Sequence, residues 1–331
     1  MGRDEGQVHL PAEMLDLIFQ LLPTRDLMVV VQVCSFWREV GEAPGLWSRG
    51  VICLARGNMS MLPEVLGARR MLLVRSLRVL DWEDMPEETV EVVVGHQGLK
   101  LLDLRGVGLS SVTSSQLARL VTGLQEVWLS YSPVASSQAG AILAGVDGGS
   151  KLRRLKMSFT DLSTVEPGLL ARAVSWLEEV DLSSSQLTLQ QTQAVLRAAA
   201  SSRQLKKLDL AMNDSLPAVK PELLASAVLN LEEFSIGYSP VSCPQIKAIF
   251  SVISGGTSLK VLKIGYNRMI QFPDERVELS KNMQGMINLL HTVKRKSFLA
   301  DVDMILLNAA FYLGYYQISM DQEWYKIVKI D

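Results

Sequence analysis

The six residues LKLLDL, Leu99–Leu104, show a pattern that recurs along most of the chain. An apolar residue, most often leucine, stands at its first, fourth and sixth positions. Eight copies follow one another: LRVLDW (Leu77–Trp82), LKLLDL (Leu99–Leu104), LQEVWL (Leu124–Leu129), LRRLKM (Leu152–Met157), LEEVDL (Leu177–Leu182), LKKLDL (Leu205–Leu210), LEEFSI (Leu231–Ile236) and LKVLKI (Leu259–Ile264). Their first leucines are separated by 22, 25, 28, 25, 28, 26 and 28 residues. A period of this length predicts a repeat protein.

The residues between the copies are typical of helices, as in SSQLARLVTG, PGLLARAVSW and LQQTQAVLRAAA. Within a strand, side chains alternate between two faces, so the fourth and sixth positions point to the same side. One strand and one helix cannot bury their apolar faces alone, but stacked units share a continuous core. We therefore expect an α/β fold: a curved stack with a parallel sheet on its inner face and helices on its outer face.

This pattern resembles the leucine-rich-repeat family, which implies a horseshoe. That family usually places Asn or Cys at the ninth position, where the side chain bonds the turning backbone. Here the ninth residues are Met85, Val107, Ser132, Thr160, Ser185, Asn213, Ser239 and Asn267. Six of these eight can form hydrogen bonds. The first two cannot, which indicates that the N-terminal repeats are degenerate.

The N-terminal stretch VHLPAEMLDLIFQLLPTRDLMVVVQVCSFWREV, residues 8–40, is rich in large apolar residues. Leu15, Ile18, Phe19 and Leu22 follow the spacing of one helical face. Pro23 ends that helix, and a second helix follows it. Two or three short helices give a small core, so we expect several apolar groups to be covered by something outside the unit.

The order of residues in this stretch is similar to the F-box, over residues 8–50. The family's F-box docks onto the Skp-type adaptor of cullin ubiquitin ligases. The resemblance implies a docking and box-core set, which the sequence alone does not divide between the two roles: Leu10, Pro11, Leu15, Ile18, Leu22, Leu27, Val33 and Trp37. A plain cap on the end of the horseshoe is the alternative.

An F-box followed by leucine-rich repeats implies a substrate receptor of an SCF-type (Skp–cullin–F-box) E3 ubiquitin ligase. The expected partners are the Skp-type adaptor, a cullin bound through it, and a target protein on the concave face. The implied role is proximity without catalysis by this chain. A ligase-independent leucine-rich-repeat scaffold or inhibitor is the alternative function.

The sequence predicts five segments: an N-terminal tail (1–7), the F-box (8–50), a connecting degenerate repeat (51–76), the repeats (77–269) and a divergent tail or cap (270–331). The connecting segment is apolar enough to be packed, so we expect one rigid body. The last segment has no copy of the repeat in register. The sequence leaves open whether it caps the horseshoe or is an unrelated ending.

Composition narrows the function further. The 331 residues are 48% hydrophobic and 21% charged, with a formal net charge of -2. That balance argues against nucleic acid as a ligand, which needs a basic surplus. We expect no membrane segment, because the longest late apolar run is too short to span a bilayer. The three cysteines are far apart, so a reducing compartment, cytoplasmic or nuclear, is expected.

No catalytic or metal-binding cluster is predicted, and no cofactor. The histidines His9, His96 and His291 lie in different segments. Cys34 and Cys243 fit inert core thiols better than nucleophiles, because no base is placed near either in the sequence. The protein is therefore not expected to be an enzyme.

Target binding is expected on the concave face, at the third, fifth, seventh and eighth positions of each repeat. Aromatic residues and arginine dominate protein-binding hot spots. The candidates are Trp128, Tyr131, Arg154, Phe159, Tyr238 and Tyr266. Two alternatives stay open: packing of these rings on neighbouring repeats, and pairing of the alternating basic and acidic repeats across the sheet.

Overall fold

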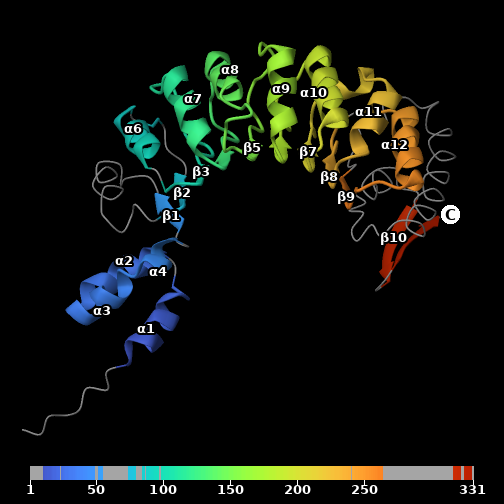
Figure 1. Ribbon diagram of the computed structural model, residues 1–331. Coiled ribbons are helices and arrows are strands. Elements are labelled where there is room, and N and C mark those ends of the chain that lie inside the picture. The colour runs from blue at the N-terminus through green and yellow to red at the C-terminus, as the bar shows by residue number, and fades with distance from the viewer. Residues whose placement is uncertain are drawn as a thin grey trace, which may run out of the picture.

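The computed structural model places the repeats in an arch, with strands on the inner side and helices on the outer side (Figure 1). A helical unit lies at the N-terminal end of the arch. The structure describes residues 10–22, 24–48, 51–54, 74–79, 84–85, 87–96, 98–239, 241–263, 316–321 and 324–329. The predicted combination of a short helical unit and a leucine-rich-repeat horseshoe is confirmed.

Four short helices form the N-terminal unit: α1 (Ala12–Phe19), α2 (Thr24–Val33), α3 (Ser35–Gly41) and α4 (Pro44–Ser48). Helix α1 ends at Phe19, and in the turn after it the N–H groups of Gln20 and Leu21 donate to the carbonyl oxygens of Asp16 and Ile18, respectively. The hydrophobic core of this unit is continuous with that of the repeats. The two parts are therefore packed together and do not hang from a loose tether.

Nine parallel strands pair in chain order along the inner face. They are β1 (Val51–Leu54), β2 (Ser76–Val79), β3 (Leu101–Asp103), β4 (Glu126–Trp128), β5 (Arg154–Lys156), β6 (Glu179–Asp181), β7 (Lys207–Asp209), β8 (Glu233–Ser235) and β9 (Val261–Lys263). Each strand bonds only the strands before and after it, which is the connectivity of a solenoid.

The convex side carries one helix per repeat (Figure 1). These helices are α6 (Glu87–Gly95), α7 (Ser114–Gly123), α8 (Ser136–Ala144), α9 (Pro167–Trp176), α10 (Leu189–Ser201), α11 (Pro221–Val228) and α12 (Cys243–Gly255). A short 3₁₀ turn, Leu216–Ala218, precedes α11. Helices are wider than strands, and the row of helices therefore lies on the outside of the curve.

In the second to the seventh copies, which the structure describes, the fourth and sixth residues form the core between sheet and helices, as predicted. In the third repeat these are Val127 and Leu129, and in the sixth they are Leu208 and Leu210, all buried. The same holds for Phe234 at the fourth position of the seventh repeat. The alternate residues of each strand that point inward and the apolar face of each helix thus pack together in one layer.

The predicted register of the first copy was wrong. Leu77 pairs with Leu102, the fourth residue of the next copy, and not with a first residue. The first repeat therefore begins at Val74, which is buried, three residues before the LRVLDW match. The sequence allowed both registers because Leu77, Val79 and Leu80 are all apolar. The register is set by burial of Leu77 against the neighbouring strand.

The ninth residues behave largely as predicted. The hydroxyl groups of Ser132 and Ser185 donate to the carbonyl oxygens of Leu104 and Met157 in the preceding repeats, at 2.6 and 2.9 Å. The Asn213 amide donates to Leu182 at 2.9 Å. Thr160 is the exception, because its buried hydroxyl has no hydrogen-bond partner. Asn267 lies outside the described residues.

Glutamines at the helix N-termini also join neighbouring repeats. The side-chain nitrogen of Gln138 donates to Leu109 and Val112 in the preceding repeat, at 2.7 and 2.6 Å. Gln191 and Gln245 form equivalent bonds one and two pairs of repeats later. Each oxygen accepts from the backbone N–H that begins its own helix. These three helices lie in the 28-residue repeats, whereas α9 and α11 begin with proline.

Near the C-terminus, β10 (Tyr316–Asp321) and β11 (Trp324–Lys329) form an antiparallel pair separate from the nine-stranded sheet. The predicted divergent tail contains this hairpin. Residues 264–315, including the end of the predicted repeat segment, lie outside the described residues. The expected segment boundaries therefore stay predictions.

Candidate functional site

The helical unit is held by a small aromatic core. Phe19 and Trp47 are fully buried, and the Trp47 indole N–H donates to the carbonyl oxygen of Gly41 at 2.7 Å. The Phe19 and Trp37 rings meet edge to face with centroids 5.5 Å apart. Gly41 is required here, because a Cβ would lie 2.8 Å from Val31 Cγ1. These contacts fix α1, α2 and α3 relative to one another.

Helix α1 carries two apolar stripes. Leu15 and Phe19 face the core. A second stripe follows the i, i+3, i+4, i+7 spacing of one helical face and is exposed: Met14, Leu17, Ile18 and Leu21. The Leu21 side chain is 85% exposed. A helix that is apolar on both faces needs cover on both, and the residues that the structure describes cover only one. We call the exposed set the outer stripe of α1.

Two further large apolar side chains are exposed on α2, Val29 and Val33, four residues apart on one face. Leu10, just before α1, is also exposed. Within a unit of four short helices, this is an unusual amount of apolar surface to leave exposed to water. The arrangement is that of a binding surface.

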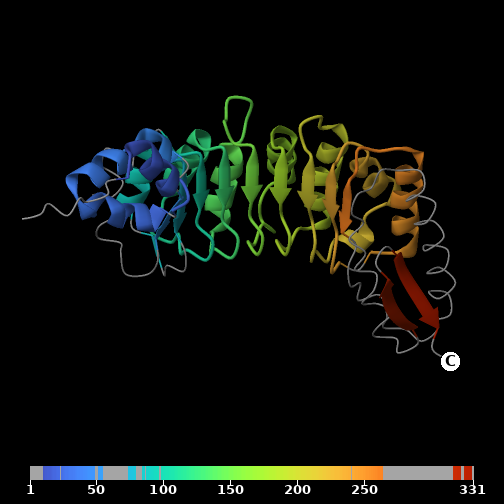
Figure 2. The same ribbon diagram turned by 90° about the horizontal axis from the view of Figure 1, so that it is seen from below.

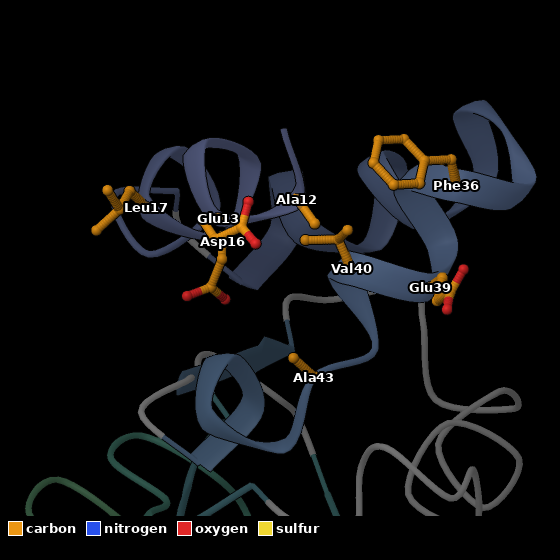
Figure 3. A pocket seen from close by; sticks show the side chains of 8 residues that line it. All are labelled: Ala12, Glu13, Asp16, Leu17, Phe36, Glu39, Val40 and Ala43. Carbon is orange, nitrogen blue, oxygen red and sulfur yellow. The ribbon is translucent and has the colours of Figure 1, made fainter. Parts of the chain in front are cut away.

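A hollow of about 650 Å³ lies beside this surface, between α1 and α3 (Figure 3). Leu17, Phe36 and Val40 supply apolar lining. Glu13, Asp16 and Glu39 add three carboxylates. An apolar hollow edged by negative charge suits an apolar side chain of a partner that also carries positive charge.

Each strand from β3 to β9 packs its second residue into the apolar core and turns its first and third residues to the concave face, where Asp103, Glu126 and Ser235 are nevertheless buried by their neighbours. Opposite charges on adjacent strands pair on this face, which confirms the predicted alternative that basic and acidic repeats pair across the sheet. Arg154 Nη2 lies 2.8 Å from Glu126 Oε2, Lys156 Nζ lies 3.1 Å from Glu179 Oε1, and Lys207 Nζ lies 3.2 Å from Glu233 Oε2. The cation of each pair is partly exposed, and ion pairs at a protein surface stabilise the fold by less than about 1 kcal/mol each.

Trp128 lies among cations. Lys156 Nζ is 4.6 Å from the ring centroid, and the guanidinium carbons of Arg105 and Arg78 are 4.8 and 5.8 Å from it. Its indole N–H donates to Glu126 Oε1 at 2.7 Å. The ring therefore packs on neighbouring repeats and is only partly available to a ligand.

From β3 to β8, each eighth residue comes three residues after its strand ends, so along the parallel sheet of Figure 2 these residues line up at the edge where the strands end. Tyr131, Phe159, Met212 and Tyr238 have left-handed backbones, with φ of 63°, 59°, 58° and 56°. All four are exposed, between 44% and 62%. The Tyr131 and Phe159 rings stack with centroids 4.2 Å apart. Ser184, also left-handed, interrupts the row. We call the four large residues the edge row.

Two aspartates lie side by side in the middle of the sheet. Asp181 on β6 pairs in register with Asp209 on β7. Among the described residues, neither carboxylate has a cation within ion-pair distance, while the neighbouring lysines bond glutamates. Burial raises the pKa of the Asp209 carboxyl above its ordinary value, and the Asp181 charge adds to the rise, while hydrogen bonds from the Ala211 N–H and the Ser235 side chain and the charge of Lys263 oppose it.

The comparison that decides the identity of the helical unit is a family model. The model described as F-box-like matches residues 8–53. The chain joins an F-box-like domain to leucine-rich repeats. The match begins where the predicted F-box begins and extends into β1.

Among solved structures, the mouse RP105/MD-1 complex is similar to this chain at 15% identity and a TM-score of 0.42. The similarity covers 68% of this chain and 36% of that one, so this chain spans about a third of the mouse protein's length. A likeness at this level carries no functional information.

The structure divides the predicted adaptor-binding set of the F-box-like domain in two. Leu10, Pro11, Ile18 and Val33 are exposed. Leu15 and Leu27 are buried, and Leu22 and Trp37 are half-buried against the core. The sequence missed Met14, Leu17, Leu21 and Val29. The available signal was the second i, i+3, i+4, i+7 series beside the first.

The predicted target-binding residues of the repeats are also separated. Tyr131, Phe159 and Tyr238 belong to the edge row, and Arg154 is exposed but paired with Glu126. Trp128 is half-buried, and Tyr266 lies outside the described residues. Met212 and the Asp181–Asp209 pair were not predicted. Whether the two aspartates can bind a ligand depends on which lysines and arginines already form ion pairs, and only the side-chain geometry shows that.

Cys34 is an exposed free thiol and not the core thiol expected. Its sulfur accepts a hydrogen bond from the Trp37 N–H at 3.4 Å and so caps the N-terminus of α3. Within the described residues, no cluster of three or more His, Cys, Asp or Glu side chains is suited to hold a metal ion. No helix in those residues has the length and apolar character to cross a membrane.

Proposed function

We propose that this protein is the substrate-recognition subunit of an SCF-type E3 ubiquitin ligase. Its F-box-like domain binds a Skp-type adaptor and, through it, a cullin. Its leucine-rich repeats bind a target protein on the concave face. The chain acts without catalysis of its own, in the cytoplasm or the nucleus.

The outer stripe of α1 carries this proposal. Met14, Leu17, Ile18 and Leu21 are exposed at helical spacing, although Leu15 and Phe19 on the same helix are buried. Burying a large aliphatic side chain gains about 1.5–3 kcal/mol. Covering the stripe together with Val29 and Val33 can therefore support a stable interface with an adaptor.

The mechanism is proximity. The core of the F-box-like domain continues into the repeats, and only two residues separate α4 from β1. A target on the concave face is therefore held at a fixed place relative to the adaptor. A fixed tether gives a high effective concentration of the target near a ubiquitin-charged enzyme.

The test is binding of the purified full chain to a recombinant Skp-type adaptor. We expect a complex with the wild type and none with the triple variant Leu17→Asp, Ile18→Asp, Leu21→Asp, because three charges cannot be buried against an apolar partner. All three side chains are exposed, so thermal melting should stay close to the wild type.

The control places charges on exposed apolar residues of the convex side, with Leu189→Asp and Leu229→Asp. That variant should bind the adaptor normally. Adaptor binding that survives the α1 substitutions, or a wild type that does not bind, would contradict the proposal. If target binding persisted without adaptor binding, the ligase-independent scaffold would be the better description.

A further inference from the structure

We propose that the target carries an arginine or lysine flanked by large apolar residues, with the basic group held by Asp181 and Asp209 and the apolar groups by the edge row. This inference rests on the proposed target-binding role of the repeats and specifies its chemistry. The occupant is a segment of a partner protein.

The edge row is an exposed, largely apolar surface. Large side chains with φ near 60° are rare, because the left-handed region favours Gly and Asn. Each costs about 1 kcal/mol or more in backbone strain. Here the strain holds Tyr131, Phe159, Met212 and Tyr238 outside the core. The exposed apolar atoms therefore come at a cost to folding, which favours a role in binding.

The row offers side chains and not backbone to a ligand. The N–H groups of Tyr131, Phe159 and Met212 donate to the next repeat, at 3.0, 2.9 and 2.9 Å. A partner strand cannot extend this ladder. From Tyr131 to Tyr238 the row crosses four strand spacings, roughly 19 Å, which an extended segment of about six residues would cover.

Charge complementarity identifies the remaining group. Glu126, Glu179 and Glu233 on the concave face each have a cation within ion-pair distance. Asp103 is held by Arg105 at 2.9 Å. In the described part of the sheet, Asp181 and Asp209 have none, although they lie in register on adjacent strands. Two half-buried like charges at this spacing repel each other.

The carboxylates are also held in place. Asp181 Oδ1 accepts from the Ser183 N–H at 3.0 Å and from its hydroxyl at 2.6 Å. Asp209 Oδ1 accepts from the Ala211 N–H at 2.9 Å. A guanidinium or ammonium group can neutralise both acids without any change in their positions.

The two features lie on the same repeats. Ser184 and Met212 each come three residues after one of the aspartates. Of the residues between, Leu182 and Leu210 are buried in the core, Ser183 and Ala211 are small, and Ser184 itself leaves the gap in the row. A cation bound at Asp181 and Asp209 therefore lies beside Phe159 and Met212, and the segment that carries it must place apolar groups next to the basic one.

The experiment selects peptides of about twelve residues, enough to span the row, from a random phage-displayed library on the purified full chain. We expect enrichment of peptides with Arg or Lys beside Phe, Leu, Met or Tyr. The best peptide, made synthetically, is then measured by fluorescence polarisation. Its affinity should fall about tenfold when its basic residue becomes Gln, and equally with the variant Asp181→Asn, Asp209→Asn.

The matched control is Glu178→Gln, Glu232→Gln, which removes the same net charge from residues just outside the concave columns and should leave affinity close to the wild type. Enriched peptides without basic residues, no enrichment, or equal loss in the control would overturn the inference. Adaptor binding by the Asp181→Asn, Asp209→Asn variant is measured separately. Its retention shows that the ligase proposal stands even if this inference fails.

Discussion

At the scale of single residues, charge placement decides which parts of the concave face are available. Most strand-borne charges are satisfied by a neighbour one strand away. Although burial would raise it, hydrogen bonds from Lys263 and Lys207 hold the pKa of Glu233 below its ordinary value. Asp209 shows the opposite shift, because burial and Asp181 both disfavour its charge. The contrast separates structural pairs from a vacant acidic pair.

The raised pKa of Asp209 predicts a pH-dependent gain from Asp209→Asn. Protonated Asp209 is favoured in the folded state, so this stabilisation is present below the ordinary pKa of 3.8 and is lost as pH rises through the higher folded pKa. At pH 7 the Asn variant should be more stable than the wild type by roughly 0.2–1 kcal/mol. The difference should shrink as pH falls toward 3.8, as urea unfolding at several pH values can measure.

Asp161→Asn provides the control with the opposite sign. Hydrogen bonds from Ser163 hold the pKa of Asp161 below its ordinary value, so ionisation of this carboxyl favours the folded state. This variant should not gain stability at pH 7. A gain at Asp161, or a loss at Asp209, would show that the local charges are not arranged as described.

At the scale of elements, the repeats are joined by more than apolar contact. Gln191 completes a capping box with Thr188 at the start of α10. Its side-chain nitrogen also donates to the Leu162 carbonyl oxygen of the preceding repeat at 2.7 Å. One buried side chain thus satisfies orphan groups of a helix and of the loop before it. Thr188 and Gln191 have the three-residue spacing of a capping box, whereas the bond to the neighbouring repeat needs the stacking of the two repeats.

Gln191→Ala should therefore destabilise the protein by about 1–3 kcal/mol, because it leaves buried carbonyl oxygens and a helix N–H without partners. Chemical denaturation followed by circular dichroism measures the change. The neighbouring Gln190→Ala is the control: Gln190 is exposed on the same helix, and its loss should change stability by less than about 0.5 kcal/mol. Equal effects at the two positions would rule out the proposed role of the buried glutamine.

At the scale of the whole molecule, the protein is a one-dimensional stack attached to a small helical domain. Each strand bonds only its sequence neighbours. Local damage should therefore stay local, because stability in a solenoid depends on each unit and its adjacent interfaces. The F-box-like domain is at one end, so its binding surface is far along the stack from the central concave face (Figure 1).

Leu208→Ala tests this behaviour. Leu208 is buried in β7, and its truncation should cost about 2–5 kcal/mol. Hydrogen–deuterium exchange should increase mainly in β6, β7 and β8, while protection of α1–α3 and adaptor binding change little. The exposed Leu229→Ala serves as control and should leave exchange near the wild-type pattern. Uniform loss of protection along the chain would show that the arch unfolds as a single unit.

The sequence alone determined the repeat period, the parallel order of the strands, the buried fourth and sixth positions and the presence of an F-box-like domain. These follow from local periodicity and from a residue order that can be read along the chain. Only the tertiary structure decided the register of the first repeat at Val74, the division of the box residues into core and surface, and the vacant pair Asp181–Asp209. Each depends on which side chains meet across repeats or helices, and residues distant in the sequence settle that through packing and pairing of charge.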